Sequence, residues 1–124
     1  MNYGILLRQI TTSYKHGNFK ERDGYPWTIR DFFNVFVAFY ELYERLMGYP
    51  HPHLRTATVE RVMERLMQDE DGYYAATDYL ESDLLESYFG SYFSERCDYS
   101  ICHFVSDGIR HYRRLRAGEI SYYE

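Results

Sequence analysis

The sequence predicts an all-α fold, a compact bundle of about five helices in a single domain that spans residues 1–124. Three observations support this prediction. The chain of 124 residues has the length of one domain. Apolar residues recur with helical spacing along most of it. Glycine and proline fall between the periodic segments, and no repeat or long linker divides the chain.

The first predicted helix covers residues 3–17 and ends at Gly17. Beyond it, Asp23-Gly24 and Pro26 are typical of turns. We therefore expect either an irregular loop or a short β-hairpin over residues 18–28.

The second predicted helix has the clearest boundaries. Thr28 is a good N-cap, and Asp31 lies three residues later in a pattern close to a capping box. Gly48 and Pro50 end the helix. Its apolar side carries Phe32, Phe33, Val35, Phe36, Phe39, Tyr40, Leu42, Tyr43, Leu46 and Met47. This stripe predicts a helix with one apolar side and one polar side.

Three further helices follow a proline-rich loop, in which His51 and His53 are expected at the surface. The third begins at Thr56 or Thr58 and stops between residues 69 and 72, and the last runs from about Tyr99 to Arg116. Thr77 is expected to cap the fourth helix, whose inward stripe is Leu80, Leu84, Leu85, Tyr88, Phe89 and Tyr92. The predicted core contains Phe32, Phe36, Phe39, Tyr43, Leu84, Tyr88, Phe104 and Ile109.

Negative charge is concentrated in one segment. The net charge is −5, and residues 68–95 hold eight carboxylates with no Lys or Arg. Tyrosine and phenylalanine are interleaved with these carboxylates, so the segment can imitate a phosphate backbone with stackable bases. The expected partner-binding residues are Asp69, Glu70, Asp71, Tyr73, Tyr74, Asp78, Glu81, Asp83 and Glu86.

In size and charge layout the chain is similar to small acidic inhibitors from phages and mobile elements, including anti-restriction and anti-CRISPR proteins. This likeness implies a non-enzymatic protein that binds a basic partner, such as a nucleic-acid-handling enzyme. The overall acidity argues against general nucleic-acid binding by the chain itself. An alternative is a structural helical subunit whose aromatic side chains form a homodimer interface.

Metal and thiol chemistry are not expected. A calcium loop starting at Asp69 would place Tyr74 and Leu80 where glycine and glutamate are needed. The histidine and cysteine spacings match no standard zinc pair. Cys102 is adjacent to His103, but neighbouring residues on a helix point in different directions, so we expect an ordinary packed cysteine. No cofactor is expected either.

One enzymatic alternative rests on "RCDYSICH", residues 96–103. Its Arg-x6-His spacing resembles the motif of HEPN-family proteins, small all-α domains that include metal-independent ribonucleases. The resemblance implies that His103 transfers protons and that Arg96 stabilises phosphate charge.

The two cysteines do not form a disulfide framework, and no apolar run is long enough to span a bilayer. We expect a cytoplasmic protein without membrane contact.

Overall fold

The computed structural model describes residues 3–17, 19, 27–67, 75–81 and 83–109. All regular secondary structure among these residues is helical, with no strand, which confirms the all-α prediction. The elements are α1 (Gly4–His16), α2 (Ile29–Met47), α3 (Thr56–Met67), α4 (Ala76–Glu81), α5 (Leu84–Phe89), α6 (Ile101–His103) and the π-helical turn η1 (Phe104–Gly108).

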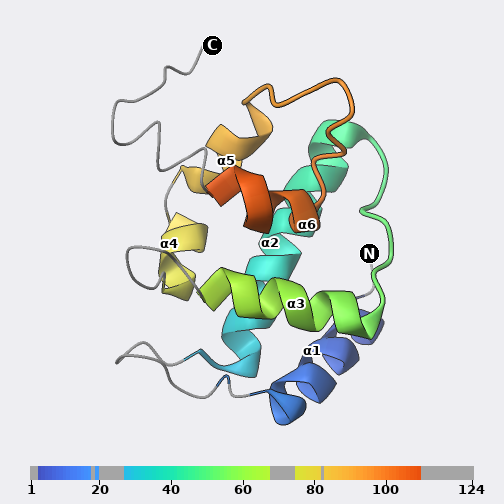
Figure 1. Ribbon diagram of the computed structural model, residues 1–124, viewed down its shortest axis with the longest axis vertical. Coiled ribbons are helices and arrows are strands. Elements are labelled where there is room, and N and C mark those ends of the chain that lie inside the picture. Colours follow the sequence, from blue (N-terminus) through green and yellow to red (C-terminus); the bar gives the residue numbers. More distant parts are fainter. Residues whose placement is uncertain (1–2, 18, 20–26, 68–74, 82, 110–124) are drawn as a thin grey trace.

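Helix α2 runs along the length of the molecule, and α3 crosses it (Figure 1). Helix α1 packs against α2 and α3, while α4 packs against α2. The short α6 and η1 pack against α3. The core between these elements is strongly aromatic, and all eight residues predicted for it are buried. Within the described residues, no helix combines the length and apolar character that crossing a membrane requires.

The boundaries of α2 confirm the sequence prediction. The Asp31 backbone N–H donates to Thr28 Oγ1 (3.1 Å), and the Thr28 N–H donates to Asp31 Oδ2 (2.9 Å), which completes a capping box. At the other end Gly48 adopts φ 83°, a left-handed conformation that glycine tolerates best. One member of the predicted apolar stripe differs, because Leu46 near the end of the helix is 55% exposed.

The prediction of the fourth helix is wrong in two respects. This part of the chain forms two short helices, α4 and α5, and the first of them begins at Ala76, before Thr77. The Ala75 N–H donates to Asp78 Oδ2 (2.7 Å), so this carboxylate satisfies a backbone donor at the start of α4. Because the chain is not one continuous helix, the inward stripe is also displaced: Tyr79 is buried, whereas Leu80 and Tyr92 are exposed.

The last predicted helix begins two residues later than expected. Ser100 caps it by accepting the His103 N–H on its side-chain oxygen (3.3 Å). After His103 the helix widens, since the Ile109 N–H bonds to the carbonyl of Phe104 five residues earlier. The Ser106 hydroxyl lies 3.1 Å from the Cys102 carbonyl and 3.0 Å from that of His103, which favours such local distortion.

Three predicted features lie outside the described residues: most of the 18–28 segment, the end of the third helix at 69–72, and the extension of the last helix to Arg116.

Candidate functional site

The structure describes three of the predicted partner-binding carboxylates. Asp78, Asp83 and Glu86 are all exposed, on or beside α4 and α5. The residues Asp69, Glu70, Asp71, Tyr73 and Tyr74 lie outside the described part, as does the side chain of Glu81. The described half of the acidic segment therefore presents its charges to solvent.

A groove of about 480 Å³ lies between α2 and the α4–α5 pair. Leu42, Leu80 and Leu85 give it an apolar lining. Glu41 and Glu86, both exposed, line it from opposite helices, together with one cation, Arg45. The lining residues are Ala38, Glu41, Leu42, Arg45, Tyr79, Leu80, Leu85 and Glu86. We call this the acidic groove.

Imitation of stackable bases would need exposed rings, but two of the three described tyrosines of the acidic segment are buried. Tyr79 and Tyr88 are each only 1% exposed. The Tyr79 hydroxyl donates to the Leu66 carbonyl (2.8 Å), so this side chain joins α4 to α3. Of the described tyrosines in the segment, Tyr92 alone is exposed. The two buried rings, Tyr79 and Tyr88, therefore belong to the core.

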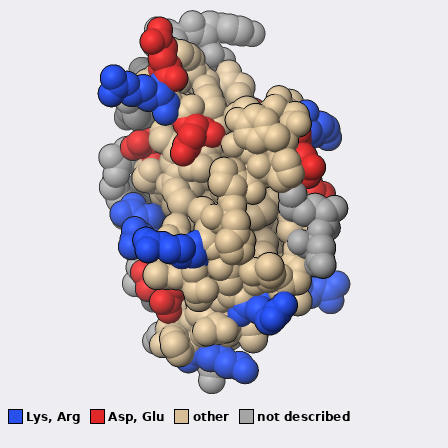
Figure 2. All heavy atoms as spheres, turned by 90° about the vertical axis from the view of Figure 1, so that its right-hand side faces the viewer, with Lys and Arg blue, Asp and Glu red and all other residues tan. Residues whose placement is uncertain are grey.

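One face of the molecule carries side chains of both charges. Figure 2 shows the face on the right of Figure 1, away from α4. Uncharged atoms fill much of its centre, and side chains of both signs lie towards its edges.

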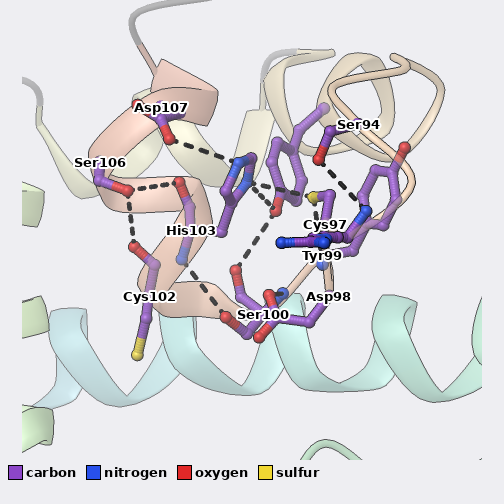
Figure 3. Close-up of polar contacts among 11 residues, drawn as sticks. Ser94, Cys97, Asp98, Tyr99, Ser100, Cys102, His103, Ser106 and Asp107 are labelled. Carbon is purple, nitrogen blue, oxygen red and sulfur yellow. Dashed lines mark hydrogen bonds and ion pairs between the residues drawn. The ribbon is translucent and has the colours of Figure 1, made fainter.

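A second cluster surrounds His103, where side chains approach both ring nitrogens (Figure 3). Nδ1 lies 2.9 Å from the Tyr88 hydroxyl and 3.5 Å from the Cys97 sulfur. Nε2 lies 3.5 Å from Asp107 Oδ2, one turn further along the chain. The His103 side chain is 20% exposed and that of Asp107 is 62% exposed. The cluster is therefore partly exposed to solvent.

The nearby carboxylate of Asp107 favours one tautomer of His103. A carboxylate accepts hydrogen bonds, so it favours the form with the proton on Nε2. Nδ1 then presents a lone pair to Tyr88 and Cys97. A thiol, an imidazole and a carboxylate in this order form the chain of groups found at activated nucleophiles.

The backbone before α6 holds Cys97 in this position. Tyr99 has φ 52°, the one positive value at a non-glycine residue in the described part of the chain. This conformation directs the Tyr99 N–H towards the Cys97 sulfur at 3.4 Å. The Ser100 N–H donates to Asp98 Oδ1 (3.0 Å), which stabilises the same turn.

The sequence singled out two neighbours of His103 that the structure does not place against it. Arg96 is exposed, and no hydrogen bond or ion pair joins its side chain to a described residue. The Cys102 sulfur points away from the cluster (Figure 3), and Cys102 is half-buried. The ribonuclease hypothesis stays a prediction. The residue missed was Cys97, because its approach depends on a non-helical turn.

The structure also corrects the prediction that His51 lies in a surface loop. Its side chain is buried, with 7% exposure. Its ring stacks on Tyr40 with 4.2 Å between centroids. Nε2 accepts the Ile101 N–H (3.1 Å), and Nδ1 donates to the Pro52 carbonyl (2.8 Å). Burial lowers the pKa of this histidine. His51 is therefore a neutral structural residue that secures the start of α6.

Among the described residues, no three His, Cys, Asp or Glu side chains are grouped so as to hold a metal ion. In the His103 cluster, Cys97 and Asp107 face different nitrogens of one ring.

No protein-family model, curated protein or solved structure matches this chain.

Proposed function

We propose that this protein is a non-enzymatic binding module whose acidic groove takes a basic segment of a protein partner. The observation that supports this most is the arrangement around the groove: leucine side chains in its lining, a carboxylate on each wall and a single cation, Arg45. Glu41 comes from α2 and Glu86 from α5, and Asp83 lies close by in the chain. Such a surface complements a segment that carries Lys or Arg beside a large apolar side chain.

The apolar lining supplies the second half of the recognition. Leu80 is 42% exposed although it is a large aliphatic residue, and Leu42 is half-buried. Covering such side chains with a partner's apolar residue would stabilise the complex by about 25 cal/mol per Å² of apolar surface removed from water. The carboxylates would direct the approach and fix the register, while the leucines would slow dissociation.

A nucleic-acid-handling enzyme is the partner class that we favour, because such enzymes have basic grooves that bind nucleic acid. If this protein occupied the basic groove of its partner, it would exclude nucleic acid, as in inhibitors of the anti-restriction or anti-CRISPR type. The burial of Tyr79 and Tyr88 removes two aromatic side chains from the proposed contact. Charge and an apolar anchor therefore carry the proposal, in place of base-like stacking.

The test is to select peptides from a random library displayed on phage, using the full chain as bait. We expect the enriched peptides to carry net positive charge around a leucine, phenylalanine or tryptophan. Association of these peptides should slow about tenfold with E41K/E86K, since steering by charge acts on the association rate. The effect should shrink as salt rises, because the Debye length is only about 8 Å at 0.15 M.

The matched control is E60K/E64K, which makes the same change of charge on α3, outside the groove. Enrichment of neutral or acidic peptides would overturn the proposal. So would equal association rates with wild type and E41K/E86K, provided that circular dichroism shows both to be folded. A nucleic-acid-handling partner, once isolated, should lose nucleic acid when this protein is added.

A further inference from the structure

The His103 cluster supports a second, chemical role that is independent of the acidic groove. None of Cys97, His103 and Asp107 lines that groove. The sulfur and the carboxylate approach opposite nitrogens of the same imidazole, each at 3.5 Å. We infer that Cys97 is a nucleophilic thiol site, with His103 as its base and Asp107 as the positioning residue, that reacts with small electrophiles such as hydroperoxides.

The proton path follows from the two nitrogens. With Nε2–H directed at Asp107, the Nδ1 lone pair is available to take the Cys97 proton. The resulting imidazolium is stabilised by the Asp107 carboxylate at Nε2. The resulting thiolate accepts the Tyr99 N–H, which already lies 3.4 Å from the sulfur. The thiolate is the reactive form of cysteine, so each of these contacts favours reaction.

Tyr88 can accommodate this transfer without leaving a buried polar group unpaired. Its hydroxyl lies 2.9 Å from His103 Nδ1 and 3.3 Å from the Ser100 carbonyl. Burial is the main cause that raises the pKa of Tyr88, so the phenol keeps its proton. When Nδ1 becomes protonated, the Tyr88 proton can turn to the Ser100 carbonyl, which leaves Nδ1–H to bond with the sulfur.

The surroundings of the sulfur favour a small reagent. Cys97 is half-buried, and the rings of Tyr88 and Phe93 lie beside His103, with the Phe93 and His103 centroids 4.7 Å apart. These rings limit the space at the site and reduce hydration of the thiolate. A hydroperoxide is small enough to react in such a limited space, because only its terminal oxygen must reach the sulfur.

The reaction with a hydroperoxide is balanced without any further reagent. The Cys97 sulfur attacks the terminal oxygen, an S–O bond forms, and the O–O bond breaks. The leaving alkoxide or hydroxide takes the proton from His103 Nδ1 and departs as an alcohol or water. The sulfur is oxidised by two electrons to a sulfenic acid, and the peroxide is reduced.

Cys102 provides an internal reference for this inference. Burial raises the pKa of its thiol, and its sulfur points away from His103 (Figure 3). The same protein molecule thus contains one thiol with a base and one without. Any general effect of temperature, buffer or reagent acts on both.

The experiment measures alkylation of both cysteines in the full chain by iodoacetamide at pH 7, followed by peptide mass spectrometry. We expect Cys97 to react about tenfold faster than Cys102, as is typical of a thiol paired with a histidine. His103→Gln should remove most of this difference and leave the Cys102 rate unchanged. In a parallel experiment, hydrogen peroxide followed by dimedone should label Cys97 and not Cys102.

Asp107→Asn guards against a folding defect in the His103 variant, because Asp107 is exposed. It should slow Cys97 alkylation about threefold, consistent with a modest electrostatic contribution, and Asp107→Glu should restore most of the rate. Equal alkylation of Cys97 and Cys102 in the wild type would overturn the inference. An unchanged Cys97 rate in both His103→Gln and Asp107→Asn would overturn it as well.

Discussion

The regions around His51 and His103 place the same side chain among aromatic rings and give it opposite roles. His51 is buried, and both of its nitrogens bond to backbone groups, Pro52 and Ile101. His103 is partly exposed, and both of its nitrogens face side chains that can gain or lose a proton. A backbone amide and a carbonyl fix one protonation state. A thiol and a carboxylate leave a proton that can move.

The first way to test this comparison is to remove each imidazole in turn. His51→Ala should lower the free energy of unfolding by about 3 kcal/mol, because it leaves the Ile101 N–H unpaired and deletes a buried ring. His103→Ala should cost about 1 kcal/mol, as for an ordinary hydrogen bond near the surface. Urea denaturation measures both. Equal losses would mean that His103 is as structural as His51.

A second change acts on the packing behind His103. A Cβ at Gly108 would lie 2.5 Å from Tyr88 Cδ1, so the buried ring must move. Gly108→Ala should therefore cost about 2 kcal/mol from overpacking. The control is Gly90→Ala, where the added carbon would lie 3.3 Å from the Glu86 carbonyl in an exposed position and the cost should be under about 1 kcal/mol. Similar unfolding midpoints for the two variants would contradict this packing.

The pH dependence of stability should report His51. Burial lowers its folded pKa below the ordinary value of 6.5, so the unfolded chain binds more protons in this range. The contribution is fully present above pH 6.5 and is lost as pH falls towards the folded pKa. One proton limits the slope to about 1.4 kcal/mol per pH unit. In His51→Gln, the free energy of unfolding should fall less steeply with decreasing pH below pH 6.5. An unchanged slope would show that other titrating groups determine this pH dependence.

The smallest expected effect concerns the exposed partner of His103. Asp107→Asn should change the free energy of unfolding by less than about 0.5 kcal/mol, since exposed ion pairs contribute little. Its effect on Cys97 alkylation should nevertheless be measurable. A loss of stability well above this value would make Asp107 a structural residue. His103 and its partner would then resemble the structural His51 and its partners.

The elements that could be predicted from sequence are those with local signals. Thr28, Asp31 and Gly48 set the ends of α2 through contacts within a few residues, and its stripe of phenylalanines predicted the core. The break between α4 and α5 has no comparable signal, because Leu80 and Leu84 keep helical spacing across it. Its consequence, the burial of Tyr79 in place of Leu80, depends on the Leu66 carbonyl of α3.

The candidate sites show the same limit. The exposure of Asp78, Asp83 and Glu86 follows from their charge. The partners of His51 and His103 do not follow from spacing. His51 meets the Ile101 N–H fifty residues away, and Cys97 reaches His103 through a turn at Tyr99 with positive φ. From the sequence only Cys102, the direct neighbour of His103 in the chain, is considered for thiol chemistry, and it is expected to be a packed cysteine; the approach of Cys97 depends on the turn at Tyr99.

The most direct test of the two roles is a long-range ¹H–¹⁵N NMR spectrum of the histidine side chains, recorded for the wild type and for Cys97→Ser. At neutral pH we predict the Nδ1–H tautomer for His51, with signals that do not respond to the substitution. For His103 we predict the Nε2–H tautomer, with an Nδ1 signal that shifts when the sulfur is replaced. An Nδ1–H tautomer for His103, or an Nδ1 signal unchanged in Cys97→Ser, would contradict the assignment of Cys97 and His103 as a reactive pair.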